Sequence, residues 1–293
     1  AEAIEAAMKF ARKFTGKKGM VAMKGSYHGK SFGALSLTFN PKYRKAFAPL
    51  VEKVSFASFG DMDSLRSVID EDTAFIILEP IQGESGIIVA PDGFLQEVRK
   101  LCDEKGILLI FDEIQAGLGR TGRLWAGEHW NTAPDILCLA KGIAGGVPMG
   151  ATLVRPDILA AISKGEHSST FGGNPISCAA GIAALTSITE DGLIENSKKM
   201  GEVFKEGLEK LKEKHTMIRE IRGKGLMIGI EMKFEVKDIL MGLIEEGVLM
   251  LYSGRNILRI LPPLVIKEED VTKVLHALDV VIDKEEEKRN VQR

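Results

Sequence analysis

The sequence has 293 residues, which is too long for one minimal core and suits one large domain with a smaller one. Its 39 basic and 41 acidic residues nearly cancel, which excludes a strong overall field for attracting nucleic acid or an anionic membrane. The longest apolar runs are far shorter than the roughly 20 residues that cross a bilayer. We therefore expect a cytoplasmic protein whose partners are small molecules, with no nucleic acid and no membrane.

Residues 1–8 already follow a helical rhythm without an initiator Met or an N-cap residue, which indicates an N-terminally truncated chain. From residue 20 onward, short apolar runs alternate with amphipathic stretches, a pattern typical of crossover units around a mainly parallel sheet. These elements predict an α/β large domain over residues 1–190. Strands are expected at 20–23, 51–56, 75–78, 107–111, 136–139 and 149–154, and helices at 62–69, 94–105 and 156–163.

The pattern changes in the last third of the chain. Two longer helices are expected at 176–189 and 193–214, and the break between them, Glu190-Asp191-Gly192, marks a domain boundary. Strand-like runs interrupted by glycine follow at 218–232 and 248–260, and 268–288 is expected to form a terminal helix. Residues 191–293 are therefore predicted to form a small α+β C-terminal domain.

The cysteines do not form a recognisable site. Cys102, Cys138 and Cys178 each lie in an apolar run, without the spacing of metal ligands. We expect buried, reduced thiols and no metal centre.

Residues 107–150 carry the side chains with the clearest chemistry. They place an acid, Asp112, at the end of a buried strand and a lysine, Lys141, after the next strand. Ligands of open α/β sheets bind outside the carboxyl ends of the strands, so both side chains are expected to face one crevice. A lysine in a dry site is costly unless it is neutralised or used covalently, as in an imine with an aldehyde cofactor. A buried structural ion pair is the alternative interpretation.

Pyridoxal chemistry needs an amine for the imine, a carboxylate beside the pyridine nitrogen and an anion site for the phosphate. The run Asp112-Glu113-Ile114-Gln115, followed by Gly119-Arg120-Thr121-Gly122 and Ala140-Lys141-Gly142, resembles the signature of class III aminotransferases. The resemblance implies fold type I of the pyridoxal-phosphate enzymes, with a mainly parallel sheet in the large domain, and pyridoxal 5'-phosphate as the cofactor. It extends over essentially the whole chain, through residues 79–84, 170–175 and 259–263.

The resemblance also assigns roles at the cofactor. Lys141 would form the imine and act as the acid/base that moves a proton between the substrate carbon and the cofactor. Asp112 would pair with the pyridinium nitrogen, and Gln115 would hydrogen-bond the phenolic oxygen of the ring. Tyr27, in Tyr27-His28-Gly29, would stack on the ring, and His28 is included among the cofactor-binding residues. On the sequence alone, Tyr27 is equally compatible with a core position.

Further roles concern the subunit partner and the substrate. Thr170 would reach the cofactor phosphate of the neighbouring subunit, which implies a homodimer with composite active sites. Arg259 would bind the substrate carboxylate, a task that suits the planar guanidinium fork. Glu84 would pair with Arg259 while a distal amine is processed and would swing away when 2-oxoglutarate binds. An ordinary surface ion pair is the alternative for this last pair.

The sequence departs from the family pattern in two places. Lys30 occupies a position that is commonly Arg in the family, which keeps the charge and loses the fork, so the grip on a second carboxylate is expected to differ. The family's main phosphate loop, a Ser-Gly-Thr/Ala run, would end where Ala1 stands. Part of the phosphate site, which relies on a helix N-terminus, is therefore expected to lie upstream of this chain.

Two other classes of function compete with this interpretation. Residues 117–122 match G-x-G-x-x-G, which in other settings binds dinucleotides, but here the preceding strand ends in two acids and no clean helix follows. A non-catalytic binding or structural remnant is the second alternative, and the retention of Lys141, Asp112 and Arg259 argues against it.

Within the enzyme interpretation, the sequence most resembles the acetylornithine type, including enzymes of arginine and lysine biosynthesis that accept a carrier-bound lysine or ornithine. The expected reaction is a ping-pong transfer of the distal amino group of an acylated ornithine- or lysine-type donor to 2-oxoglutarate. Ornithine or 4-aminobutyrate aminotransferase is the alternative. This choice rests on analogy within the family.

Overall fold

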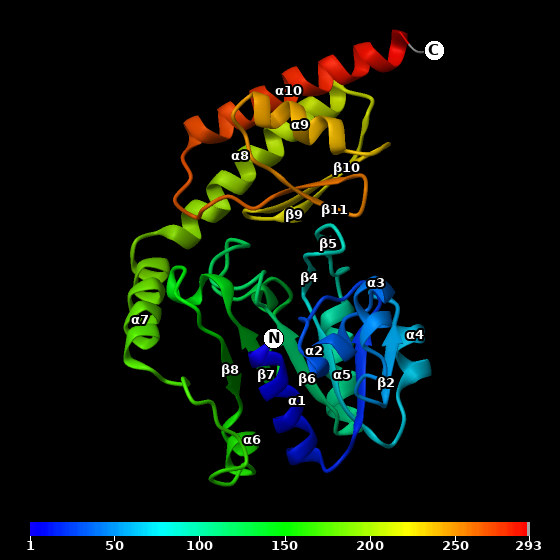
Figure 1. Cartoon of the computed structure of the whole chain (residues 1–293), viewed down its shortest axis with the longest axis vertical. Helices are drawn as coiled ribbons and strands as arrows, with labels where there is room; N and C mark the ends of the chain where they lie inside the picture. The colour runs from blue at the N-terminus through cyan, green and yellow to red at the C-terminus, as the bar shows by residue number, and fades with distance from the viewer. Residues whose placement is uncertain (292–293) are drawn as a thin grey trace. The chain divides into compact units, whose positions relative to one another are not determined.

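A six-stranded sheet organises the first two thirds of the chain (Figure 1). Its strand order is β2-β1-β3-β6-β7-β8, and every neighbouring pair is parallel except β7 with β8. The mainly parallel α/β sheet expected from the sequence is thus confirmed. The strands are β1 (Gly19–Met23), β2 (Val54–Ala57), β3 (Thr73–Leu78), β6 (Leu108–Asp112), β7 (Ile136–Leu139) and β8 (Ala151–Val154).

The central strands β1, β3 and β6 are buried along their whole length, which explains why their sequences are continuous apolar runs. Helix α1 (Glu2–Thr15) contacts β3, β7 and β8, and it buries one apolar face that includes Ile4 and Met8. Helix α5 (Phe94–Lys105) ends at Gly106, whose positive φ of 61° suits a residue without a side chain.

Short helices connect the remaining strands of this part, and one long helix closes it. These elements are α2 (Phe32–Leu37), α3 (Pro41–Arg44), η1 (Lys45–Phe47), α4 (Met62–Val68), η2 (Ala126–Trp130), η3 (Lys141–Ala144), α6 (Pro156–Ala160) and α7 (Pro175–Glu190), with the short strand β4 (Ile81–Gln82).

The last third of the chain builds a separate antiparallel sheet of order β11-β12-β10-β9, with three helices on one of its faces (Figure 1). Apolar side chains of the helices and strands, among them Phe204, Ile230 and Leu258, form its core. Its strands are β9 (Ile218–Lys224), β10 (Met227–Met232), β11 (Leu251–Ser253) and β12 (Ile257–Ile260), and its helices are α8 (Leu193–Lys214), α9 (Lys237–Glu245) and α10 (Glu268–Val291).

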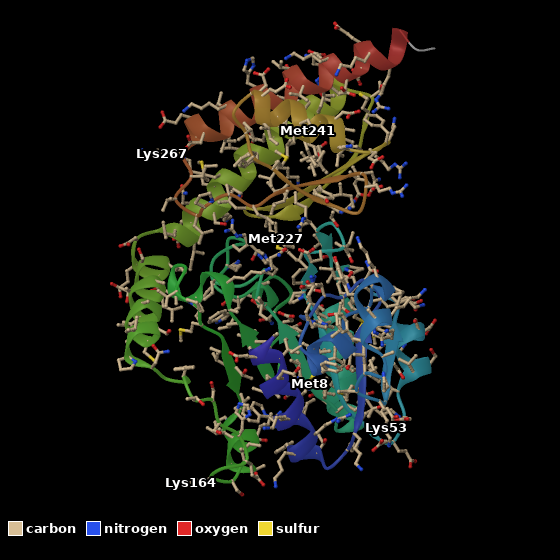
Figure 2. All side chains as sticks on the ribbon, viewed as in Figure 1. Met8, Lys53, Lys164, Met227, Met241 and Lys267 are labelled. Carbon is tan, nitrogen blue, oxygen red and sulfur yellow. The ribbon has the colours of Figure 1, made fainter. Side chains whose placement is uncertain are left out.

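The structure is a computed structural model that describes residues 1–291, and these form two compact units, each with its own core. Unit 1 consists of residues 1–83, 90–118 and 125–191. Unit 2 consists of residues 84–89, which include β5 (Ile88–Val89), residues 119–124, and the chain from 192 onward. A single boundary after residue 190 therefore does not describe the two short segments that join unit 2. Met8 and Met227 are buried in unit 1 and unit 2, respectively (Figure 2).

Several expectations need correction. The helix expected at 156–163 ends at Ala160, and the strand expected at 149–154 begins at Ala151. Cys102 and Cys138 are buried thiols, but Cys178 is only partly buried because it lies on the more open helix α7. Among the described residues, no helix is both long enough and apolar enough to cross a membrane.

Candidate active site

Four parallel strands of unit 1 deliver polar side chains to one edge of the sheet. Tyr27 and His28 follow β1, Glu79 directly follows β3, Asp112 is the last residue of β6, and Lys141 lies two residues after β7. Because the carboxyl ends of parallel strands share an edge, these residues occupy the position where α/β sheets bind ligands. The edge predicted from Asp112 and Lys141 therefore also carries polar side chains that follow β1 and β3.

Asp112 is the most firmly held acid at this edge. Its side chain is 4% exposed, its Oδ2 lies 2.7 Å from Nδ1 of His28, and its Oδ1 accepts a hydrogen bond from the backbone N–H of Ile114 at 3.1 Å. The His28 ring is fully buried, and its Nε2 has no hydrogen-bond partner among residues 1–291. The pair fixes the direction in which the Asp112 carboxylate points.

The backbone around His28 explains how that ring reaches Asp112. The N–H of His28 donates to Oγ1 of Thr38, at the end of α2, over 3.0 Å. Gly29 has φ 132°, and a Cβ there would lie only 2.9 Å from Cβ of Ala1 and 3.1 Å from Cβ of Ala34. Only glycine fits this tight and left-handed position. The Tyr27-His28-Gly29 run therefore has a fixed loop conformation that only glycine allows at its third position.

Tyr27 is partly buried and does not lie in the core. Its ring meets the ring of Tyr43 edge to face, with the centroids 5.9 Å apart. The exposed Lys30 side chain makes a cation–π contact with Tyr43, with Nζ 4.8 Å from the ring centroid.

Glu79 belongs to the run 79–84 that carries part of the family resemblance, but the sequence alone gave it no role. Its buried carboxylate accepts two backbone hydrogen bonds, from the N–H of Tyr27 and from the N–H of Gly83, each at 3.0 Å. Burial raises the pKa of Glu79 to about 7, and the charge of Asp112 adds to this rise, whereas His28 and the two N–H groups oppose it. An acid directly after a buried strand is the same signal that identified Asp112.

Gln115 lies against Gly83. A Cβ on Gly83 would be 2.0 Å from Oε1 of Gln115, so any larger residue at position 83 would displace the amide. The Oε1 atom is itself buried and has no hydrogen-bond partner among the described residues. Like Nε2 of His28, it is a buried polar atom without a partner among the described residues.

Lys141 begins the short helix η3 and has φ 48°, in the left-handed region. A residue with a side chain pays on the order of 1 kcal/mol or more for this conformation, and such strain gathers at functional sites. The side chain was expected in a dry site, but it is exposed within the described chain.

Thr170 lies in the exposed stretch that precedes α7, as does its neighbour Phe171. Ile176 and Ile182 of the following helix α7 are also strongly exposed, so several large apolar side chains near Thr170 in sequence are open to solvent within the described chain.

Unit 2 holds the predicted pair of Arg259 and Glu84. The Nη1 atom of Arg259, on β12, lies 2.9 Å from Oε1 of Glu84. The Arg259 side chain is 7% exposed, whereas that of Glu84 is 41% exposed. The guanidinium is thus buried and its carboxylate is open to water on one side.

Glu113, the second acid of the signature, holds the backbone at the start of η2. Its two oxygens accept the N–H groups of Ala126 and Gly127 at 2.6 and 2.8 Å, at the start of η2, and burial raises its pKa to about 7. The G-x-G-x-x-G match at 117–122 leads into this turn region, and the next helical residue is Ala126 of a five-residue 3-10 helix. A dinucleotide site needs a helix N-terminus directly after the glycines, so that alternative is wrong.

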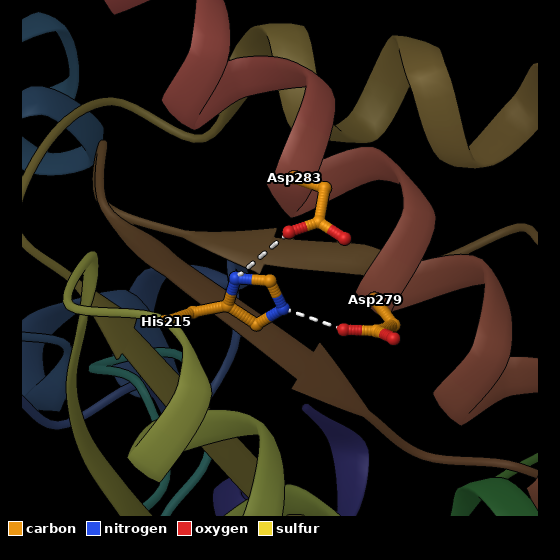
Figure 3. A group of neighbouring side chains, drawn as sticks. All are labelled: His215, Asp279 and Asp283. Carbon is orange, nitrogen blue, oxygen red and sulfur yellow. Dashed lines mark hydrogen bonds and ion pairs between the residues drawn. The ribbon is translucent and has the colours of Figure 1, made fainter. Parts of the chain in front are cut away.

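A further titratable cluster joins α8 to α10 in unit 2 (Figure 3). The buried His215 places Nε2 2.6 Å from Asp279 and Nδ1 3.7 Å from Asp283. Lys214 donates to the same two aspartates at 2.8 and 2.7 Å. Hydrogen bonding to Lys214 lowers the pKa of Asp279, with a smaller contribution from His215. Because an ammonium already occupies the carboxylates, we assign this cluster to helix packing.

The comparisons with known proteins agree with the geometry. The family described as aminotransferase class-III matches residues 1–282. The acetylornithine aminotransferase of Caldanaerobacter subterraneus is 44% identical over 289 residues, which cover 96% of this chain and 73% of that protein. A [LysW]-aminoadipate semialdehyde/glutamate semialdehyde transaminase of Sulfurisphaera tokodaii is 42% identical, covering 99% of this chain and 75% of that protein.

A solved structure of the Toxoplasma gondii ornithine aminotransferase, described with partial occupancy of PLP at its active site, superposes with a TM-score of 0.95. It is 34% identical, and the match covers 99% of this chain and 72% of that one. The chain therefore belongs to the class III aminotransferases. It is a transaminase that depends on pyridoxal phosphate.

The residues of unit 1 fit that cofactor. The edge offers a rigidly held carboxylate in Asp112, a buried acceptor in Gln115 Oε1 that suits a ring hydroxyl, and an exposed lysine in a strained conformation. A lysine, a carboxylate and a polar contact to the ring are what pyridoxal chemistry requires of a protein.

Proposed function

We propose that the protein transfers the distal amino group of an acylated ornithine- or lysine-type donor to 2-oxoglutarate, in two half-reactions at one site. Pyridoxal phosphate supplies the aldehyde that takes up the amino group and the electron-poor ring that acidifies the neighbouring C–H bond. The chain supplies attachment, proton transfer and recognition of the two substrates. The identity of the relatives named acetylornithine aminotransferase and [LysW]-aminoadipate semialdehyde transaminase supports this donor class.

The side chains of unit 1 are proposed to hold the cofactor and to move the proton. Lys141 would hold the aldehyde carbon of the cofactor through Nζ, and its amine would carry the proton to and from the substrate carbon. Asp112, fixed by His28, would keep the ring nitrogen protonated, because a carboxylate at close range favours the charged form of its neighbour. Gln115 would contact the phenolic oxygen, and Tyr27 would cover one ring face.

The observation that carries the proposal is the pairing of a buried Arg259 with a half-exposed Glu84. A buried guanidinium with a charged partner is stable, yet a partner that remains in contact with water is displaced at lower cost than a buried one. Glu84 can therefore neutralise Arg259 while the donor presents its distal amine, and the α-carboxylate of 2-oxoglutarate can take its place. Lys30 would meet a second carboxylate as a point charge.

We further propose a homodimer in which Thr170 serves the cofactor phosphate of the neighbouring subunit. The exposure of Thr170 and of the apolar side chains of Phe171, Ile176 and Ile182, which follow it in the chain, supports this arrangement. An apolar surface of this kind is typical of a protein interface.

The first experiment is a donor panel with 2-oxoglutarate as acceptor. N-acetylornithine, a carrier-linked lysine, ornithine and 4-aminobutyrate are compared by kcat/KM. The proposal expects an acylated donor to be preferred. A preference for free ornithine or for 4-aminobutyrate would select the alternative within the same family.

The second experiment tests the gate in single-turnover measurements of the two half-reactions. In Glu84→Ala, Glu84 no longer competes with an α-carboxylate for Arg259, so the ratio of the half-reaction rates should shift toward glutamate. Arg259→Ala should damage the glutamate half-reaction most. If both half-reactions fall by one factor in Glu84→Ala, Glu84 is not a gate.

A further inference from the structure

Arg222, Gly229 and Arg259 lie side by side across three strands of unit 2. In the register of the sheet, Gly229 on β10 is directly opposite Arg222 on β9 and directly opposite Arg259 on β12. Residues directly opposite each other in an antiparallel sheet project from the same face. Two arginines therefore flank a position that has no side chain.

The segment 84–87 lies on this face. Arg259 holds the Glu84 carboxylate, and the Nε atom of Arg222 donates to the carbonyl oxygen of Gly86 at 3.0 Å. A Cβ added to Gly229 would be 2.9 Å from that same carbonyl oxygen and 3.1 Å from Cβ of Ile87. The absence of a side chain at Gly229 thus lets the segment approach between the two arginines.

Other contacts fix the same segment. The hydroxyl of Ser253 donates to the carbonyl oxygen of Glu84, Ile87 is fully buried, and Gly86 packs against Ile257 with φ 104°. The backbone that carries Glu84 is consequently attached to the sheet that carries Arg259. With the backbone held, Glu84 can leave Arg259 only by rotation of its own side chain.

Arg222 is well placed to hold the segment 84–87 on the sheet. Its side chain is 11% exposed, and its Nη1 atom is held at 2.8 Å by Glu231 while Nε reaches Gly86. Arg219 binds the other oxygen of Glu231 at 2.9 Å, but its side chain is 56% exposed and, within the described residues, it makes no hydrogen bond to segment 84–89. Arg219 and Arg222 both bind Glu231, and of these two arginines only Arg222 also donates to the segment 84–87 that carries Glu84.

We propose that Arg222, with Gly229 beside it, is a positioning residue for the Glu84 gate and thereby tunes the choice between the two substrates of the transaminase. This inference rests on the proposed function. Arg222 fixes the backbone at Gly86, which sets how strongly Glu84 competes with a substrate carboxylate for Arg259. A looser segment weakens the grip of Glu84 and shifts the site toward glutamate.

The test measures both half-reactions of the holoenzyme in single turnovers, with glutamate and with the best distal-amine donor of the panel. Arg222→Lys keeps a charge but cannot hold Glu231 and Gly86 together in the fork geometry. The rate ratio should move toward glutamate, by up to about tenfold for one charged hydrogen bond. Arg219→Lys is the matched control and should leave the ratio unchanged.

A double-mutant cycle shows whether Arg222 acts through Glu84. In the Glu84→Ala background the gate is gone, so Arg222→Lys should cause no further shift in the ratio. Gly229→Ala retains both arginines and pushes on Gly86, so it should shift the ratio in the same direction even if Arg222→Lys folds poorly. The inference is overturned if Arg219→Lys shifts the ratio equally, or if the Arg222→Lys shift persists without Glu84. It is also overturned if Gly229→Ala leaves the ratio unchanged.

Failure of the proposed function looks different. It would appear as a donor preference outside the acylated class, or as an unchanged ratio in Glu84→Ala itself. The rate ratio of the double variant is therefore compared with the rate ratio of Glu84→Ala alone.

Discussion

Nδ1 of His28 lies 2.7 Å from Oδ2 of Asp112, and both side chains are almost completely buried in unit 1. The two residues come from different strand ends, and their contact gives the Asp112 carboxylate one orientation. The other carboxylate oxygen accepts the N–H of Ile114, so the acid is held at both oxygens. The proposed cofactor site therefore contains a carboxylate whose orientation is fixed.

The first prediction concerns the charge of Asp112. Asp112→Asn keeps the shape but removes the charge that would hold the ring nitrogen protonated, so the chemical step should slow by at least about 100-fold. Single-turnover rates of the loaded enzyme measure this step, and thermal unfolding monitors the fold.

The control for this variant is Asp135→Asn. Asp135 is equally buried, but it binds Arg99 at 2.8 Å and also Arg155, away from the proposed site. Its substitution should lower the melting temperature with little effect on the rate of the folded enzyme. Near-normal turnover in Asp112→Asn would contradict the assignment.

The second prediction follows from Glu79. Because burial raises the pKa of Glu79 to about 7, folding favours the protonated carboxyl. Its contribution to stability is therefore fully present below the ordinary glutamate pKa and is lost as the pH rises through about 7. Glu79→Gln cannot ionise, so it should remove up to about 3 kcal/mol of pH dependence between pH 4.5 and 7.

Urea unfolding midpoints across this pH range measure the effect of Glu79→Gln. The readout is the change of the unfolding midpoint with pH and not the midpoint at one pH. The amide also places a donor against a backbone N–H, which lowers stability at every pH. Glu71→Gln, at an exposed glutamate, should leave the slope as it is in the wild type. An unchanged slope in Glu79→Gln would show that Glu79 ionises normally in the folded protein.

The third prediction tests the composite site. Lys141→Ala and Thr170→Ala chains are each expected to have little activity. In a mixed dimer both defects fall in one site and the other site is intact. Random exchange makes half of the dimers mixed, so activity should recover to about a quarter of the wild-type value. Native mass spectrometry establishes the exchange, and its occurrence without recovery would argue against a shared site.

The sequence predicted the regular elements best where glycine marks their ends. The helix expected at 94–105 is present with the same bounds because Gly93 and Gly106 flank it, and the helix at 193–214 begins after Gly192. Helix α9, at Lys237–Glu245, was not predicted, and neither was the six-residue helix α2. Short helices owe more to tertiary packing than to their own pattern.

The sequence placed Asp112 and Lys141 at strand ends because the apolar runs before them are unambiguous. It did not reveal that His28 meets Asp112, since that contact joins residues that are 84 positions apart. It also missed Arg222 and Gly229, whose alignment with Arg259 depends on the register of three strands. Register is a tertiary property that a single strand sequence does not specify.

The most direct test of the whole account is the identity of the lysine that binds the cofactor. The protein is loaded with pyridoxal phosphate, reduced with borohydride, digested and mapped by mass spectrometry. The account predicts that the pyridoxyl mass is on the peptide containing Lys141, and that Lys141→Ala abolishes both the label and turnover. A label on any other lysine, or turnover retained in Lys141→Ala, would contradict it.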